Sequence, residues 1–98
     1  MNFRFLTPAL SEISDASEYY ENEVSGLGID FIDEVDSTIH RILKYPRAWS
    51  KISDEFRHCN LRRFPYTIIY HQPQENEVLI VSVFHQSRKP NSWKNNLK

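Results

Sequence analysis

Apolar residues recur along the chain at two different spacings, first every three or four positions and later every second position. Over residues 8–24 the longer spacing predicts an amphipathic helix, whose apolar stripe is Leu10, Ile13, Ala16 or Ser17, Tyr20 and Val24. A second helix is predicted over residues 29–44, with the stripe Ile32, Val35, Ile39, Ile42 and Leu43. The two glycines of the chain, Gly26 and Gly28, fall between these helices. A helical hairpin is therefore expected.

The ends of both helices carry recognisable signals. Thr7 is expected to cap the first helix, with Pro8 at the first helical position, where its missing N–H costs nothing. Tyr45-Pro46 should end the second helix, because the residue before a proline disfavours helical geometry. The polar face of the first helix carries four acidic residues, Glu12, Asp15, Glu18 and Glu21.

Four segments favour β-strands. They are Asn2–Leu6, Phe56–Phe64, Tyr66–His71 and Val78–His85. Pro65 lacks a backbone donor, so it should lie at a bulge or an edge between the second and third strands. The stretch 78–84 is almost wholly apolar, which predicts a central strand covered on both faces.

This order of elements predicts an α+β fold in which an N-terminal strand and a helical hairpin precede a three-stranded antiparallel meander. Residues 1–98 are expected to form one domain, since a chain of 98 residues cannot supply two independent cores. The hairpin should cover one face of the sheet. The other face needs cover from the polar tail 86–98, whose only large apolar residue is Trp93, or from a bound partner.

The net charge of −1 conceals two oppositely charged parts. Residues 1–36 contain nine acids and one base, whereas residues 37–98 contain eleven bases and four acids. A basic C-terminal part suits an acidic or phosphate-rich partner, although an uneven solvated surface is the simpler interpretation.

Several classes of site lack their sequence signals. No apolar run approaches the roughly 20 residues of a membrane span, and the N-terminus does not resemble a signal peptide, so a cytoplasmic protein without membrane association is expected. The lone Cys59 cannot form an internal disulfide or a multi-thiolate zinc site, and the four histidines are scattered. Phosphate-binding loops and nucleophile elbows are missing too, so no metal and no cofactor are expected.

Cations and aromatic residues concentrate in the second half of the chain. Together they can bind phosphates and stack on bases. The alternative is that the arginines balance the acidic helices, the tyrosines pack in the sheet and the tryptophan plugs its edge. The set consists of Arg57, Arg62, Arg63, Tyr66, Tyr70, His85, Arg88, Lys89 and Trp93.

Two motifs in this region resemble a known family. The run Leu61–Tyr70, with the sequence LRRFPYTIIY, precedes the apolar strand, and HQSRKPNSW follows it over His85–Trp93. Both are similar to the C-terminal signature of ParE toxins in the RelE/ParE superfamily. The resemblance implies a helical hairpin on a small antiparallel sheet and the toxin role in a type II toxin–antitoxin pair. It also implies a cognate antitoxin, with which the toxin forms a hetero-oligomer.

Members of the superfamily have one of two activities, and the residue at one position of the sequence favours one of them over the other. RelE-like members cut mRNA on the ribosome, and their third strand commonly reads Tyr-Arg-aliphatic-aliphatic-Tyr. Thr67 stands where that arginine would be, and there is no lysine between Ser53 and Arg88. The charge that would stabilise a cleavage transition state is therefore depleted. If the chain is nevertheless such an endoribonuclease, Arg62, Arg63, His85 and Arg88 are its candidate catalytic residues.

ParE-like members instead inhibit DNA gyrase without cutting RNA, and the resemblance favours this activity. It suggests Arg88, Lys89 and Trp93 as target-binding residues, and Tyr66 and Tyr70 as antitoxin-binding residues. A third hypothesis is an inactive toxin that retains only antitoxin binding.

Overall fold

A four-stranded sheet in the order β1-β4-β3-β2 forms the centre of the computed structural model, which describes residues 1–98. Its strands are β1 (Asn2–Phe5), β2 (Phe56–Asn60), β3 (Tyr66–Gln74) and β4 (Glu77–His85). Strands β2, β3 and β4 form the expected antiparallel meander, and β1 pairs in parallel with β4. The sheet is therefore mixed. As predicted, β4 is an interior strand, since it lies between β1 and β3.

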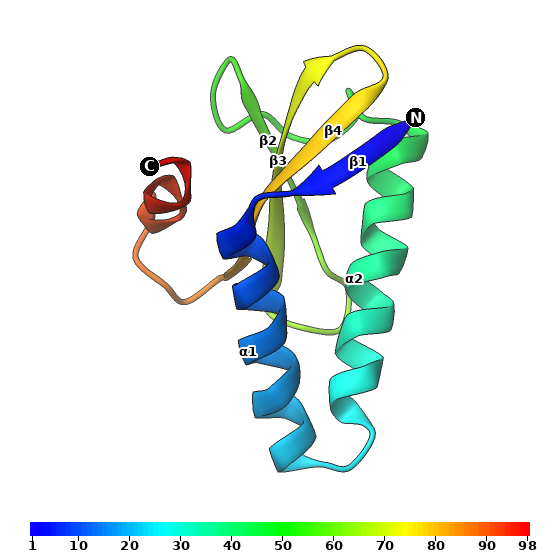
Figure 1. Cartoon of the computed structure of the whole chain (residues 1–98), viewed down its shortest axis with the longest axis vertical. Coiled ribbons are helices and arrows are strands. Elements are labelled where there is room, and N and C mark those ends of the chain that lie inside the picture. Colours follow the sequence, from blue (N-terminus) through cyan, green and yellow to red (C-terminus); the bar gives the residue numbers. More distant parts are fainter.

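Two antiparallel helices, α1 (Thr7–Glu23) and α2 (Leu27–Lys44), lie together on one side of the sheet and extend beyond its end (Figure 1). Both elements match the predicted hairpin. The main hydrophobic cluster lies between these helices and the sheet, and includes Phe31, Ile39, Ile68 and Ile80. The α+β fold is thus the one that the order of elements predicted.

The predicted apolar stripes were partly wrong. Leu10 of α1, Val24 at its C-cap and Ile32 of α2 are exposed, whereas Phe31 is fully buried. Most other positions of the predicted stripes, among them Val35 and Ile39, do face the core. On α1 the fully buried positions are the small residues Ala9 and Ala16, which allow close approach to β4.

Both helix starts also differ from the prediction. Thr7 is the first residue of α1 and Leu6 is its N-cap, without a side-chain hydrogen bond. Helix α2 begins at Leu27, two residues earlier than expected, after Gly26 in a left-handed conformation with φ of 89°. The carboxylate of Glu21 accepts hydrogen bonds from the backbone N–H groups of Gly26 and Gly28. A side chain of α1 thus satisfies the free donors at the start of α2.

Strands β2 and β3 have other bounds than the sequence suggested. Strand β2 ends at Asn60 rather than Phe64, because the chain bends over residues 61–65, the last of which is Pro65. Leu61 and Phe64 turn back into the core instead of continuing the ladder. Strand β3 continues to Gln74 and includes Pro73. Arg62 and Arg63 therefore lie in a loop and not on a strand.

The C-terminal segment covers the sheet face opposite the helices. A 3-10 helix, η1 (Ser92–Leu97), lies beside β4 on the side away from α1 and α2 (Figure 1). Its residue Trp93 packs with Ile69, Val81 and Phe84 in a second hydrophobic cluster. Of the two expected covers for this face, the tail is the one that the structure shows.

Gly28 allows the close contact between the two helices. A Cβ at this position would lie 2.5 Å from the backbone oxygen of Ser17. Because a backbone atom cannot swing away, Gly28→Ala should force the helices apart and lower the free energy of unfolding by about 1–3 kcal/mol. Urea denaturation of both proteins measures this difference.

Ser25→Ala is the matched control, since Ser25 is an exposed residue of the same turn. It should change the unfolding free energy by less than about 0.5 kcal/mol. Equal stability of Gly28→Ala and the wild type would contradict the proposed packing.

Candidate functional site

The predicted His85, Arg88 and Lys89 lie where the chain leaves β4. The His85 Nδ1 accepts hydrogen bonds from the Ser87 backbone N–H (3.0 Å) and hydroxyl (2.8 Å). Its ring lies edge-on to Tyr66, with 4.9 Å between ring centroids. The Arg88 guanidinium lies 5.4 Å from the Phe84 ring centroid, and Lys89 is exposed. Two cations therefore stand on the surface at this end of the sheet.

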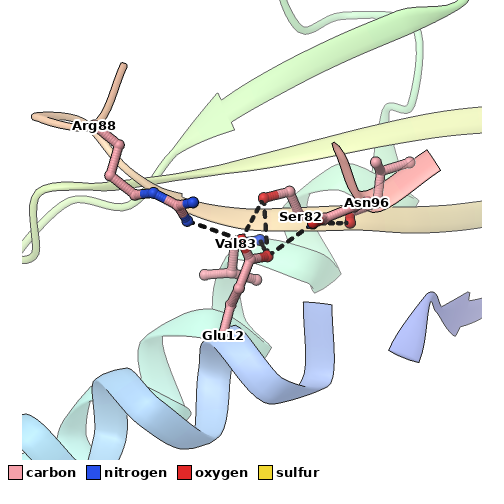
Figure 2. A network of polar contacts seen from close by, with 6 residues as sticks. Glu12, Ser82, Val83, Arg88 and Asn96 are labelled. Carbon is pink, nitrogen blue, oxygen red and sulfur yellow. Dashed lines mark hydrogen bonds and ion pairs between the residues drawn. The ribbon is translucent and has the colours of Figure 1, made fainter. Parts of the chain in front are cut away.

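The carboxylate of Glu12 fixes Arg88 to the body of the protein (Figure 2). Arg88 Nη1 lies 3.1 Å from Glu12 Oε2, and the same carboxylate accepts hydrogen bonds from Ser82 Oγ, the Val83 N–H and Asn96 Nδ2. These partners come from β4, the following loop and η1, whereas Glu12 itself belongs to α1. One side chain thus connects the helical hairpin with the C-terminal tail.

A cavity of about 210 Å³ opens between α1 and the ends of β3 and β4. It brings together three of the predicted site residues, Tyr66, His85 and Arg88, with a carboxylate pair and an exposed tyrosine of α1. The lining is Glu12, Asp15, Ala16, Tyr19, Tyr66, Val83, His85 and Arg88.

Tyr66 and Tyr70 differ sharply in their accessibility. Tyr66 is half-buried against Tyr20 and Phe31 and still reaches the cavity beside α1. Tyr70 is only 1% exposed, and its hydroxyl donates a hydrogen bond to the Pro46 carbonyl. Burial raises the pKa of both phenols. The side chain of Tyr70 is part of the core, so of the two tyrosines only Tyr66 is placed where an antitoxin could contact it without a rearrangement.

Trp93 is buried in this structure. With 4% of its surface exposed, it packs 5.1 Å from the Phe56 ring and fills the second hydrophobic cluster. The alternative packing interpretation is therefore confirmed for Trp93. Its predicted contact with a target stays a prediction, and that contact would require the indole to leave the sheet.

The structure does not bring all four nuclease candidates together, because His85 and Arg88 line the cavity beside α1 but Arg62 and Arg63 do not. Arg63 is held by α2, because its backbone N–H donates to Glu34 (2.7 Å) and its guanidinium lies 3.7 Å from Asp30. Arg88 is held by Glu12 on α1. Arg63 thus balances the acidic helix, as the simpler interpretation proposed, and its guanidinium and that of Arg88 are tied to different helices.

Other reactive groups do not form a site. Cys59 is buried, and burial raises the pKa of its thiol against the opposing effect of Arg41 and Arg62, so the nucleophilic thiolate is disfavoured. No three His, Cys, Asp or Glu side chains converge into a group that could hold a metal ion. None of the helices combines the length and apolar character that crossing a bilayer requires.

Comparison with known proteins decides the family. Residues 3–90 match the family described as "ParE toxin of type II toxin-antitoxin system, parDE". The chain belongs to this ParE toxin family. A solved structure described as the chromosomal ParDE TA system from P. aeruginosa superposes with a TM-score of 0.71 and 11% identity, covering 87% of this chain and 95% of that one. At this identity the likeness shows the fold alone. No curated protein sequence matches the chain.

Thr67, which stands where the resemblance to RelE-like members would place an arginine, is an uncharged residue of β3. Thr67 is buried, and its hydroxyl donates a hydrogen bond to Asn60 Oδ1 (2.6 Å). It lines an apolar cavity of about 290 Å³ beside Ile69 and Trp93. His58 is the only titratable side chain in that lining. No arginine or lysine lines this cavity, so the cavity itself supplies no fixed positive charge to stabilise a cleaved phosphodiester.

Sequence analysis of the ParE-family chain missed Glu12 and Asn96. Glu12 was placed on the solvated face of α1, yet its side chain is only 16% exposed. Counting the helical repeat from the buried Ala9 would have placed Glu12 on the inward stripe with Ala16. Asn96 has no comparable signal, because the fold of η1 depends on the sheet that it covers.

Because Trp93 covers one face of the sheet, replacing its side chain with a small one is predicted to lower stability strongly. Trp93→Ala should lower the free energy of unfolding by about 3–5 kcal/mol, because it leaves a cavity over β4. Asn95→Ala, an exposed position of the same 3-10 helix, should change it by less than about 0.5 kcal/mol. Urea denaturation compares the two variants, and a Trp93→Ala protein as stable as the wild type would refute the role.

The buried Tyr70 hydroxyl predicts a pH effect at the alkaline end. Its pKa is higher in the folded than in the unfolded protein, so its contribution to stability is complete below pH 10 and is lost as the pH rises above 10. Tyr70→Phe should lower the unfolding free energy at pH 7 by about 1 kcal/mol, through the lost hydrogen bond to Pro46. The same substitution should also reduce the decline of the unfolding free energy above pH 10. Denaturation curves measured from pH 7 to 11 test both effects, and parallel curves for variant and wild type would contradict the assignment.

Proposed function

We propose that this ParE-family protein acts in the cytoplasm as the toxin of a toxin–antitoxin pair, inhibits DNA gyrase and is neutralised by a cognate antitoxin. The observation that carries the proposal is the placement of Arg88 and Lys89. Both side chains are exposed directly after β4, on a segment that Glu12 and Trp93 hold against the sheet. They form a cationic surface that the fold keeps in place.

The closed sheet face favours inhibition by binding over RNA cleavage. A nuclease needs positioned cations and a proton-transfer group around the scissile phosphate. Here the sheet face that carries Thr67 is apolar, and Arg63 is paired with acids of α2. A binding protein requires only exposed complementary groups, and these are present at Arg88 and Lys89.

The antitoxin is proposed to contact the cavity between α1 and the sheet. Tyr66 and the exposed Tyr19 form aromatic walls there, and Asp15 and Arg88 lie at its rim. Such a mixture of aromatic and charged groups is typical of the energetic centres of protein interfaces. An antitoxin at this position would lie next to Arg88 and could block the proposed gyrase contact directly, within a hetero-oligomer.

A supercoiling assay with purified gyrase tests the proposed target. The wild-type toxin should inhibit supercoiling and accumulate cleaved DNA complexes. The double variant Arg88→Ala/Lys89→Ala should raise the half-inhibitory concentration at least about tenfold, equivalent to roughly 1.4 kcal/mol of binding. Arg47→Ala/Lys51→Ala is the control, because it removes two exposed cations from the loop before β2.

The other outcomes separate the alternatives. Absence of both inhibition and cleaved complexes at toxin excess would remove gyrase as the target. Cuts in mRNA on translating ribosomes would establish the RelE-like alternative instead. Normal growth of a host that expresses the chain alone would favour an inactive antitoxin-binding module.

A further inference from the structure

We propose that Glu12 is a positioning residue that presents Arg88 to the target, an inference that rests on the proposed function. Strand β1 accompanies β4 only as far as the pair Phe5 and Ile80. Beyond that point side chains take the place of a neighbouring strand. Glu12 Oε1 accepts the Val83 N–H at 3.1 Å, and Asn96 Nδ2 donates to the Val81 carbonyl at 3.0 Å.

The Glu12 carboxylate uses both of its oxygens in this network. Oε1 receives hydrogen bonds from Ser82 Oγ (2.9 Å), the Val83 N–H (3.1 Å) and Asn96 Nδ2 (3.1 Å), and Oε2 receives Arg88 Nη1 (3.1 Å) and a longer bond from Ser82 (3.2 Å). A carboxylate offers about four acceptor sites, and the four donor groups found here occupy all of them. Figure 2 shows it rising from α1 into the gap beside β4.

The network determines where the Arg88 charge lies. Glu12 binds one terminal nitrogen of the guanidinium, while Phe84 packs against its plane 5.4 Å from the ring centroid. The side chain is still 48% exposed, so its remaining N–H groups face solvent. A long side chain that is already ordered loses less conformational entropy when a partner binds. Glu12 thereby prepares Arg88 for the contact without touching the partner itself.

A double-mutant cycle separates positioning from a general effect on the fold. The variants are Glu12→Gln, Arg88→Met and their combination, with half-inhibition of gyrase supercoiling as the readout. Glu12→Gln should weaken inhibition about tenfold when Arg88 is present and less than about twofold in the Arg88→Met background. An equal loss in both backgrounds would overturn the proposal, because Glu12 would then act independently of Arg88.

Glu18→Gln is the matched control. It makes the same substitution at an exposed position of α1 that does not line the cavity, and it should leave inhibition unchanged. Thermal unfolding confirms that each variant is folded at the assay temperature. If Glu12→Gln does not fold, Glu12→Asp replaces it in the cycle, since it keeps the charge but withdraws it by one methylene.

Limited trypsin digestion tests the same inference without gyrase. Cleavage after Lys94, which lies within η1, requires the tail to leave the sheet. It should be several-fold faster in Glu12→Gln than in the wild type and unchanged in Glu18→Gln. Equal rates for Glu12→Gln and the wild type would refute the positioning role. If the wild type fails to inhibit gyrase while the tail is released as expected, only the proposed target is wrong.

Discussion

The structure depends on cover for both faces of β4. This strand is almost wholly apolar between Val78 and Phe84, and exposure of either face would forfeit roughly 25 cal/mol for each Å² of apolar surface. The helical hairpin covers one face. The chain itself covers the other by folding η1 back and inserting Trp93. Where β1 ends, Glu12 and Asn96 satisfy the remaining edge of the strand.

This arrangement also decides where the protein can act. Both faces of the sheet are covered, and the cavity and the exposed cations Arg88 and Lys89 lie at the end of β4 beside α1. The cations there do not stand alone, because Glu12 holds Arg88 and the buried indole anchors the segment that carries Lys89. The proposed toxin that works by binding agrees with three observations. These are membership of the ParE family, the neutral Thr67 and the exposed cations.

Much of the fold followed from the spacing of apolar residues, because helices and strands have different periods. The hairpin, the meander and the interior position of β4 were predicted, and the ParE family was identified from the motif over His85–Trp93. The burial of Phe31 in place of Ile32 was not predicted, since the two residues are equally apolar and only packing distinguishes them. Site residues were harder still. Trp93 has the same sequence signal whether it covers a sheet or contacts a partner, and Glu12 has the composition of a solvated residue.

The burial of Trp93 in the free protein is the claim on which this account depends. Acrylamide quenching of tryptophan fluorescence in a Trp49→Phe variant measures it directly, because Trp93 is then the only tryptophan. The account predicts a quenching constant several-fold smaller in the native protein than in urea. A native Trp93 quenched as readily as in the unfolded chain would show that the tail is detached and the sheet face open.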